Sequence, residues 1–434
     1  MVAGSGAAAV AFASAPHRGA LFPIAVSAAG CGTSGACPGG TTMKILLTVE
    51  SYWPSRGGCQ EVVRQLARRL AERGHDVTVA TSADPARGEG LIDGVRVVGF
   101  EISGNEVAGY RGDTQAYVDW VRDKKADVIL NYSAQVWPTD LLLPVLSKLE
   151  ARKVLVPCGY SMLRVPRYRD SYARLPAILR GYDRLVHLSD VYRDAEFARE
   201  HALSHAVVIP NGCGADEFDP VPAIDIRRRL GIPPGAFLVL HVGSHTALKG
   251  HGDCLRIFRG ARLRDAHLLL VGNDVPGGCG GRCRARAWLA NWSPLDVLRH
   301  SRVTVADLDR EAIVAAHHAA DLFLFPSNVE CSPLVLFEAA ATGTPFLATD
   351  VGNVAEIASW TGGGEVLPTT FETSGLAHVD VTAGATRLRA LWRDRAGRER
   401  MGAAAHAAWR ARFTWEKIVS DYERLFFDLV EAPS

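Results

Sequence analysis

Two glutamates, Glu330 and Glu338, stand eight residues apart in a segment that is otherwise rich in apolar residues. An ionised carboxylate accepts hydrogen bonds from paired hydroxyl groups, so one glutamate at each end of a diphosphate would hold a nucleotide sugar from both sides. The spacing alone is equally compatible with two solvated surface carboxylates. The elements that carry the two residues therefore decide how they are interpreted.

Residues 321–325 form a short apolar run that fits a buried strand, and residues 333–341 carry apolar side chains at helical spacing. Glu330 is therefore expected in the loop between strand and helix, and Glu338 within the helix. In open α/β folds such loops lie at the carboxyl edge of a sheet, where ligands bind. The N–H groups at a helix start favour an anion there.

The whole chain from Lys44 onward alternates apolar strand patterns with helical patterns, which predicts parallel sheets. A polar, proline-containing linker after Asn211-Gly212 separates two such series, so two domains are expected. The expected strands cover residues 45–49, 76–81, 95–100, 127–130, 153–156, 183–188 and 207–209, and then 237–242, 267–271, 302–305, 321–325 and 345–348.

The predicted domains are residues 43–215 and 216–413, and a helix in residues 414–434 would brace them. Tandem α/β domains bury ligands between their sheet edges, so the cleft between them is the expected site. Residues 1–42 are rich in Ala, Gly and Ser with almost no charge, and are expected to be a disordered extension.

Composition excludes several classes of protein. A formal net charge of +1 over 434 residues gives no reason to expect a nucleic-acid partner. The nine cysteines are an odd, scattered number that suits reduced thiols in the cytoplasm better than a secreted disulfide framework. No apolar run reaches the length needed to span a membrane.

Two short patterns raise the question of a metal ion. Cys279 and Cys283 form a C-x3-C pair, but no second Cys or His pair follows at zinc-site spacing, so the sequence does not favour a metal there. Asp307 and Asp309 form an Asp-x-Asp pair just ahead of a helical stretch. Because aspartate is a preferred N-cap, a capping role is favoured over metal binding.

Several segments together resemble the GT-B fold retaining glycosyltransferases of family 4, the glycosyl transferases group 1. The matching segments, in chain order, are Gly57-Gly58, 189–197, 208–212, Gly243 with Lys249-Gly250, and Glu330 to Glu338 followed by 343–345. Each motif is weak by itself, but their order and spacing are specific. The resemblance covers about residues 43–430 and implies two doubly wound Rossmann-like α/β domains that face a central cleft.

The resemblance implies transfer of a sugar from a nucleotide-diphosphate-sugar donor to an acceptor hydroxyl, with retention and without a metal or other cofactor. Glu330 would contact donor sugar hydroxyls on the catalytic side, and Glu338 the ribose. Lys249 would hold the leaving diphosphate, where developing charge makes a fixed cation most effective. Backbone groups for the donor would come from Gly57, Gly58, Gly243, Cys331, Ser332 and Leu334.

Two positions depart from the family pattern. Ser244 stands where an arginine usually binds phosphate, so His245 or a displaced arginine would compensate, or Lys249 and backbone groups would suffice. Asn131 or Tyr132 stands where many members carry a histidine near the transferred sugar, which leaves the acceptor and sugar side open.

Three alternatives also stay open. A nucleotide-sugar-binding scaffold without turnover would explain Ser244, and a GT-B epimerase or phosphorylase would share the fold. The arginines after Gly58 suggest weak peripheral contact with the inner face of a membrane, although a solvated helix surface is the simpler interpretation. The base and sugar of the donor and the identity of the acceptor are not encoded in any readable motif.

Overall fold

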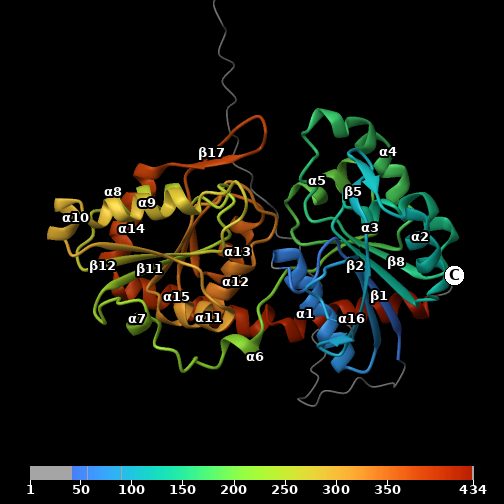
Figure 1. The fold of residues 1–434 in the computed structure, drawn as a ribbon, viewed down its shortest axis with the longest axis horizontal. Helices are drawn as coiled ribbons and strands as arrows, with labels where there is room; N and C mark the ends of the chain where they lie inside the picture. The colour runs from blue at the N-terminus through green and yellow to red at the C-terminus, as the bar shows by residue number, and fades with distance from the viewer. Residues whose placement is uncertain (1–41, 56, 89, 433–434) are drawn as a thin grey trace, which may run out of the picture. The chain divides into compact units, whose positions relative to one another are not determined.

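The structure is a computed structural model that describes residues 42–55, 57–88 and 90–432 (Figure 1). The predicted N-terminal extension lies outside the described residues except for Thr42. The described residues form one compact unit, which is built around two separate sheets, both of them parallel except at one edge of the first. The domain boundaries given above remain predictions.

The first sheet has eight strands in the order β10-β9-β8-β7-β1-β2-β4-β3, and every pairing is parallel except that of β3 with β4. Its central strands are buried on both faces, as parallel strands covered by helices must be. The strands are β1 (Lys44–Thr48), β2 (Asp76–Ser82), β3 (Leu91–Ile92), β4 (Val95–Phe100), β7 (Val128–Tyr132), β8 (Arg152–Val156), β9 (Arg184–His187) and β10 (Ala206–Val208).

Helices cover both faces of this sheet. They are α1 (Gly58–Glu72), α2 (Thr114–Asp123), α3 (Trp137–Asp140), α4 (Arg169–Leu179) and α5 (Arg193–Glu200), with 3-10 turns η1 (Leu143–Lys148) and η2 (Pro166–Tyr168). A small hairpin of β5 (Ser103–Asn105) and β6 (Gly109–Arg111) stands apart from the sheet.

The second sheet has six parallel strands in the order β13-β12-β11-β14-β15-β16. Its first strand, β11, has all six residues buried, which fits its unbroken apolar sequence apart from one histidine. The strands are β11 (Phe237–Val242), β12 (Ala266–Val271), β13 (Arg302–Ala306), β14 (Leu322–Phe325), β15 (Phe346–Thr349) and β16 (Gly364–Leu367).

The helices of the second half again lie on both faces of its sheet. They are α6 (Ala215–Phe218), α7 (Ile226–Arg229), α8 (His251–Ala261), α9 (Gly280–Asn291), α10 (Pro294–Leu298), α11 (Arg310–Ala319), α12 (Leu334–Ala341), α13 (Val354–Thr361), α14 (Val381–Arg393) and α15 (Arg395–Arg412). A hairpin of β17 (Thr369–Phe371) and β18 (Ala377–Val379) completes it.

In each sheet the order of the strands reverses at one point, because later strands are added on the other side of the first strand. In the first sheet this point lies between β1 and β7, and in the second between β11 and β14. The loops that leave two such strands diverge, and the crevice between them is where open α/β sheets bind ligands. The second crevice therefore lies between the loop that carries Lys249 and the loop that carries Glu330.

The last helix, α16 (Trp415–Glu431), returns from the second half to the first (Figure 1). Its apolar face buries Ile418, Tyr422 and Phe426 in the same core as β1 and α1. At its start, Cys213 and Thr414 form an isolated parallel bridge. The C-terminal helix is thus part of the first half's core.

The arginines of α1 are engaged by acidic groups of the linker region and of α16. Arg69 is buried and donates to Asp216 and Glu416, and Arg73 donates to Glu423. Arg68 also pairs with Asp216. The surface that suggested lipid contact therefore carries intramolecular ion pairs. Within the described ranges, none of the helices combines the length and apolar character needed to cross a bilayer.

Candidate functional site

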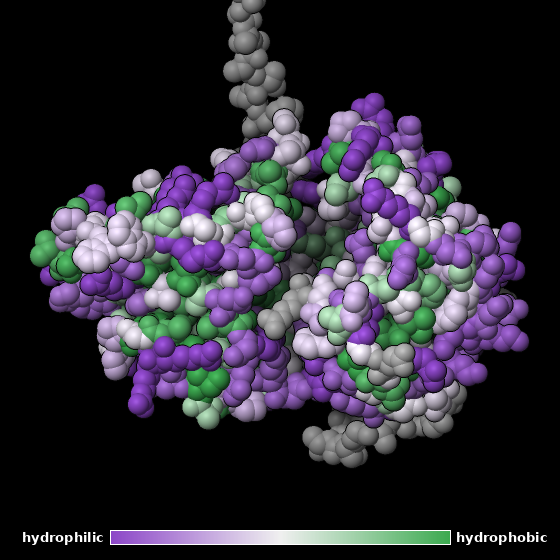
Figure 2. All heavy atoms as spheres, in the orientation of Figure 1, coloured by the Kyte–Doolittle hydropathy of each residue, from purple (hydrophilic) through white to green (hydrophobic). Residues whose placement is uncertain are grey.

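A cavity of about 720 Å³ opens where the carboxyl ends of the two sheets approach each other. This volume lies within the range of about 300–1,000 Å³ that is usual for small-molecule sites. Figure 2 shows the groove between the two halves, whose outer surfaces are mostly hydrophilic. Its lining includes Gly57, Gly58, Tyr132, Gly243, Ser244, Lys249, Glu330, Cys331, Ser332, Leu334 and Glu338.

Lys249 and Glu330 contact each other in this cleft. The Lys249 Nζ lies 2.7 Å from Glu330 Oε1, and the Ser327 hydroxyl donates to the same oxygen at 2.7 Å. The Glu330 side chain is only 10% exposed, whereas that of Lys249 is 30% exposed. The carboxylate is therefore fixed, and the ammonium group is the partner with freedom to move toward a ligand.

A glycine makes this contact between two loops sterically feasible. Gly250 has a φ of 72°, and a Cβ at this position would lie 1.8 Å from the carbonyl oxygen of Pro326. Any other residue would strain the backbone and push the two loops apart. The Lys249-Gly250 motif thus places the cation beside the loop that carries Glu330.

Glu338 lies deeper, on α12, and belongs to a second charged group. Arg310 at the start of α11 donates to Glu338 Oε1 at 2.6 Å and to Glu217 Oε2 at 2.8 Å, and His317 Nε2 lies 3.6 Å from Glu338 Oε2. Burial alone would raise the pKa of the Glu338 carboxyl, but Arg310 and His317 hold this pKa at about 2. Glu338 is therefore a fixed anion in the physiological pH range.

Sequence reasoning found Glu338 but neither Arg310 nor Glu217. Arg310 is 93 residues from Glu217 and 28 residues from Glu338 in the chain, and no local spacing links the three residues. Arg310 directly follows Asp309, whose side chain accepts from Ala312 N at 2.8 Å and caps α11. The predicted capping role of Asp309 is thus confirmed, and the cap orients the helix that presents Arg310.

The opposite wall begins at the start of α1. A Cβ added to Gly58 would meet no atom within 4 Å, and one added to Gly57 would meet only the end of the Gln60 side chain. The protein itself therefore does not demand glycine at position 58. The absence of side chains leaves the N–H groups of the first helical turn accessible from the cleft.

The loop after β11 carries Ser244, which stands where the family pattern has an arginine. Ser244 lines the cleft and donates to Asn273 Oδ1 at 2.8 Å. His245 is fully buried and lies outside the cleft lining, so it does not replace the missing arginine. Arg64 and Arg310 do line the cleft, and they are the candidates for a displaced arginine.

Asn131 and Tyr132 are neighbours at the end of β7, and their side chains lie on opposite faces of the sheet. Consecutive residues of a strand point to opposite faces of the sheet. Tyr132 lines the cleft, whereas Asn131 is buried, donates to Thr48 Oγ1 at 2.8 Å and accepts from the Tyr182 hydroxyl at 2.9 Å. The expectation that Asn131 faces an acceptor or sugar is therefore corrected, because both ends of its amide are used in the core.

Three cysteines also line the cleft: Cys59, Cys158 and Cys331. A hydrogen bond from Cys158 and another from Ser133 outweigh burial and lower the pKa of the Cys59 thiol to about 7. Burial raises the pKa of Cys331. The sequence singled out only the backbone of Cys331, since thiols at three distant places in the chain, one of them in the first turn of α1, give no common signal.

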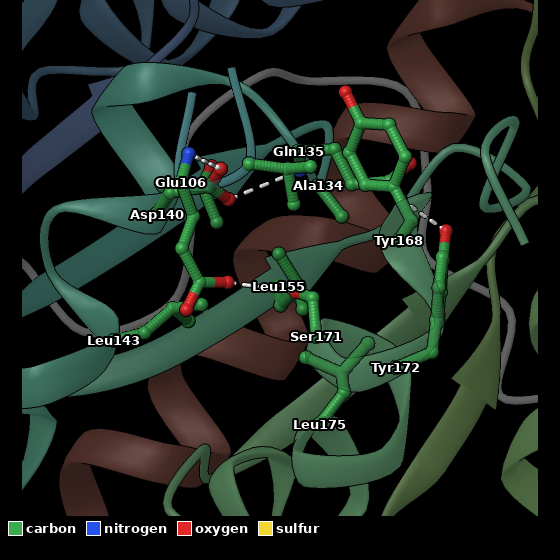
Figure 3. Close-up of a pocket in the computed structure, with 12 residues that line it drawn as sticks. Glu106, Ala134, Gln135, Asp140, Leu143, Leu155, Tyr168, Ser171, Tyr172 and Leu175 are labelled. Carbon is green, nitrogen blue, oxygen red and sulfur yellow. Dashed lines mark hydrogen bonds between the residues drawn. The ribbon is translucent and has the colours of Figure 1, made fainter. Parts of the chain in front are cut away.

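A second, much smaller cavity lies within the first half, between β8, α3, α4 and the turn that joins β5 to β6 (Figure 3). Its volume of about 20 Å³ suffices for roughly one water molecule. Asp140 lies at one side and accepts from the backbone N–H groups of Gln135 and Glu106 at 3.1 and 3.2 Å. This cavity is a packing feature around a buried carboxyl and is too small for a sugar.

Comparison with known proteins agrees with this geometry. A family model described as glycosyl transferases group 1 matches residues 223–405, and one described as glycosyl transferase 4-like domain matches residues 57–212. An N-acetyl-alpha-D-glucosaminyl L-malate synthase of Bacillus anthracis is 24% identical over 404 residues, which are 89% of this chain and 98% of the relative. A D-inositol 3-phosphate glycosyltransferase of Xylanimonas cellulosilytica is 27% identical, covering 83% of this chain and 89% of the relative.

Solved structures share the fold. The sucrose-phosphate synthase of Thermosynechococcus elongatus superposes with a TM-score of 0.71 at 22% identity, covering 90% of this chain and 99% of that structure. The Anabaena protein HepE in complex with UDP and glucose gives a TM-score of 0.66 at 16% identity, covering 89% and 100%. With two family matches in the same order as the two sheets, and with this shared architecture, the chain is a GT-B glycosyltransferase and belongs to the glycosyl transferases group 1 family.

Proposed function

We propose that this enzyme transfers a sugar from a nucleotide-diphosphate-sugar donor to an acceptor hydroxyl, with retention of the anomeric configuration. The observation that carries the proposal is the pair of charged groups on one wall of the cleft, Lys249 with Glu330 and Arg310 with Glu338. The carboxylates can accept hydrogen bonds from the hydroxyls of a sugar and a ribose, and the cations can bind the diphosphate between them.

Lys249 is proposed to bind the donor diphosphate. In the structure its ammonium group is held by Glu330, and a diphosphate in the cleft would attract it away from this carboxylate. As the bond to the sugar breaks, negative charge grows on the leaving diphosphate, so the cation stabilises the transition state more than the bound donor. With the N–H groups at the α1 start opposite, we infer that no metal is needed for this step.

Glu330 is proposed to accept hydrogen bonds from hydroxyls of the transferred sugar. Ser327 still holds Oε1 when Lys249 turns to the phosphate, so the carboxylate keeps its place and exposes lone pairs. Transfer with retention would then proceed by attack from the side of the departing phosphate, which leaves Glu330 a binding and orienting role beside the reacting carbon.

Glu338 is proposed to bind the ribose hydroxyls. Each carboxylate oxygen has about two lone-pair directions, so Glu338 can accept from hydroxyls without losing Arg310. Arg310 in turn is fixed by Glu217 and is the stronger candidate for the phosphate ligand that Ser244 lacks. Arg64 is held by Asp93 at 2.8 Å and is closer to the acceptor side.

The acceptor is proposed to be a small anionic compound with a free hydroxyl. Two similar enzymes are named for L-malate and D-inositol 3-phosphate, and both of these compounds combine a negative charge with hydroxyl groups. Arg64 lines the first-half side of the cleft and would pair with such a charge. Because every cysteine in the described part of the chain is free, we place the reaction in the cytoplasm.

A thermal-shift screen against UDP, GDP and ADP sugars tests the donor class. A donor at 100 times its dissociation constant should add about 2.7 kcal/mol of stability. Glu338→Gln should lose most of this gain, because the variant lacks the charged ribose acceptor. If none of the nucleotide sugars raises the melting temperature of the wild-type enzyme, the proposed donor class is wrong.

A further inference from the structure

A second chemistry-bearing cluster lies in the second half of the molecule, behind the loop that carries Lys249. His245 stands in this loop, His251 is the first residue of α8, and Cys279 caps the start of α9. All three side chains are buried, with exposed fractions of 0%, 2% and 7%. Cys283 follows one helical turn after Cys279 and is buried to the same degree.

The distances within the cluster are those between ligands of one ion. The Cys279 Sγ lies 3.6 Å from His245 Nδ1 and 3.8 Å from His251 Nδ1, and all three ligand atoms lie within 4.8 Å of one another. Bonds of about 2.3 Å to sulfur and about 2.0–2.1 Å to nitrogen at a tetrahedral angle put these ligand atoms about 3.6 Å apart. The cluster therefore already has the spacing of a tetrahedral site.

The hydrogen bonds around the histidines have the pattern of metal ligands. His251 Nε2 lies 3.0 Å from the carbonyl oxygen of Gly243, so the proton sits on Nε2 and the lone pair of Nδ1 faces the cysteine. A ring nitrogen bonded to a backbone carbonyl is the usual support of a metal-bound imidazole. His245 points Nδ1 at the same sulfur, and its buried Nε2 has no hydrogen-bond partner.

Without an ion, this arrangement is costly. Buried polar groups are normally paired, yet His245 Nε2 and the neighbouring His241 Nε2 both lack partners. A metal ion binds an imidazole nitrogen that carries a lone pair, and His251 directs the lone pair of Nδ1 at the cluster because its Nε2 donates to the Gly243 carbonyl oxygen.

We propose that His245, His251 and Cys279 bind a zinc ion, with Cys283 as the fourth ligand. Sulfur and imidazole donors in a tetrahedral set favour zinc over magnesium or calcium. Cys283 N donates to the Cys279 carbonyl oxygen at 2.9 Å, which puts Cys283 one helical turn beyond Cys279, and a change of its rotamer would bring its thiol to the ion. On binding, each thiol loses its proton to solvent.

The ion has a structural task. It joins the β11–α8 loop to the start of α9, where Cys279 N already donates to the carbonyl oxygen of His245 at 2.8 Å. Lys249 lies between the two histidine ligands in the chain and only two residues before His251. The zinc ion therefore fixes the loop that presents Lys249, and no step of sugar transfer runs through it.

The sequence did not favour this site because the Cys279 and Cys283 pair has no second pair of ligands close to it in the chain. The histidines precede it by 34 and 28 residues, and the fold alone brings the two pairs together. The sequence led us to expect no metal either at the donor diphosphate or at Cys279 and Cys283, and the proposed ion departs from the second of these expectations. It stands apart from the proposed diphosphate site. The inference therefore does not depend on the identity of the donor.

Zinc content and cobalt spectra of the reduced, full-length protein test the site. We expect about one zinc ion per chain after purification, and after exchange with Co²⁺ a sulfur-to-cobalt charge-transfer band with the strong visible bands of a tetrahedral ion. Cys279→Ala and His251→Ala should each lose the bound ion, and the charge-transfer band should vanish in Cys279→Ala. Cys213→Ala is the matched control, because Cys213 is equally buried but belongs to a different core.

Metal binding by the wild-type protein still tests the proposal if a variant of one of the ligand residues fails to fold. A reduced wild-type chain that binds neither zinc nor cobalt would overturn the proposal. A cobalt complex without thiolate absorption, or a soluble Cys279→Ala variant with unchanged zinc content, would do the same. Loss of zinc from Cys213→Ala alone would place the ion elsewhere and would also contradict it.

Discussion

Single side chains set the electrostatics of the cleft, since each of the two glutamates is held by one cation. Glu330 is paired with a flexible lysine, and Glu338 with an arginine that a third carboxylate orients. A lysine moves its charge on a long stem, whereas an arginine holds a fixed planar geometry. The end of the site proposed for the sugar and phosphate is thus adaptable, and the end proposed for the ribose is rigid.

The first prediction concerns the mobile cation. Lys249→Gln should lower kcat/KM for sugar transfer by about 10²-fold or more, because a cation at the leaving diphosphate is removed. Lys417→Gln, at an exposed position on α16, should leave transfer unchanged. Steady-state kinetics with a saturating acceptor measure both variants. Full activity in Lys249→Gln would assign the phosphate to other groups.

A second prediction concerns the buried Asp140 (Figure 3). Burial raises the pKa of its carboxyl from 3.8 to about 7, so the folded state binds a proton more tightly than the unfolded state. Its contribution to stability is complete below pH 4 and is lost as the pH rises through 7, at up to about 1.4 kcal/mol per pH unit.

The melting temperature of the wild-type enzyme should therefore fall more between pH 5 and pH 7.5 than that of Asp140→Asn. One of these pH values lies below the raised pKa of Asp140 and the other lies above it. Asp119→Asn changes a half-exposed carboxyl on α2 and should follow the wild type. Parallel pH profiles for the wild type and Asp140→Asn would show that Asp140 is not the titrating group.

At the level of helices and strands, the pattern of apolar residues explains which elements could be predicted from the sequence. Every strand expected from the sequence is present, with its ends shifted by at most two residues. The edge strand β16 was missed because it begins with Gly364, which normally weakens a strand. Here a Cβ would lie 2.0 Å from the ring of Phe346, so glycine is required by a contact that only the fold creates.

The residues of the candidate site likewise fall into those that local pattern predicts and those that only the fold brings together. Lys249 and Glu330 lie in loops that follow strands, and Glu338 lies within the helix after such a loop, so local pattern predicts their position near the sheet edge. Arg310 acquires its role only through contacts with Glu217 and Glu338, which are distant in the chain. Side-chain direction also escapes the sequence, since the pattern of β7 does not tell which face holds the core contacts of Asn131.

A third prediction tests the helix that closes the first half. Phe426→Ala should cost about 3–5 kcal/mol, because the ring is fully buried between α16 and the first sheet. Val430→Ala, at a position 38% exposed on the same helix, should cost well under about 1 kcal/mol. Thermal unfolding compares the two variants. Equal effects would mean that α16 does not contribute to this core.

Several hydrogen bonds join the two halves of the enzyme around the cleft. Asn353 donates to the Leu188 carbonyl oxygen at 3.0 Å, Asn211 to that of Ser332 at 3.1 Å, and Arg193 to that of Gly375 at 3.2 Å. Such contacts rearrange at lower cost than an apolar interface. Closure around a bound donor would exclude water that could hydrolyse it.

A fourth prediction follows at this scale. A bound nucleotide sugar should slow hydrogen exchange of backbone amides in residues 243–250 and 327–336 of the second half and also in residues 57–61 of the first. All three segments border one cavity, so a single ligand should protect them together. Protection confined to the second half would mean that donor binding does not involve the α1 start.

The most direct measurement of the central claim is release of nucleoside diphosphate by the wild-type enzyme and by Glu330→Gln, with a nucleotide sugar and a panel of small anionic hydroxyl acceptors. The wild type should release the diphosphate, and Glu330→Gln should release it at least about 10²-fold more slowly while still gaining thermal stability from the donor. Equal rates for the two proteins, or donor binding to the wild type without any release, would contradict sugar transfer at this cleft.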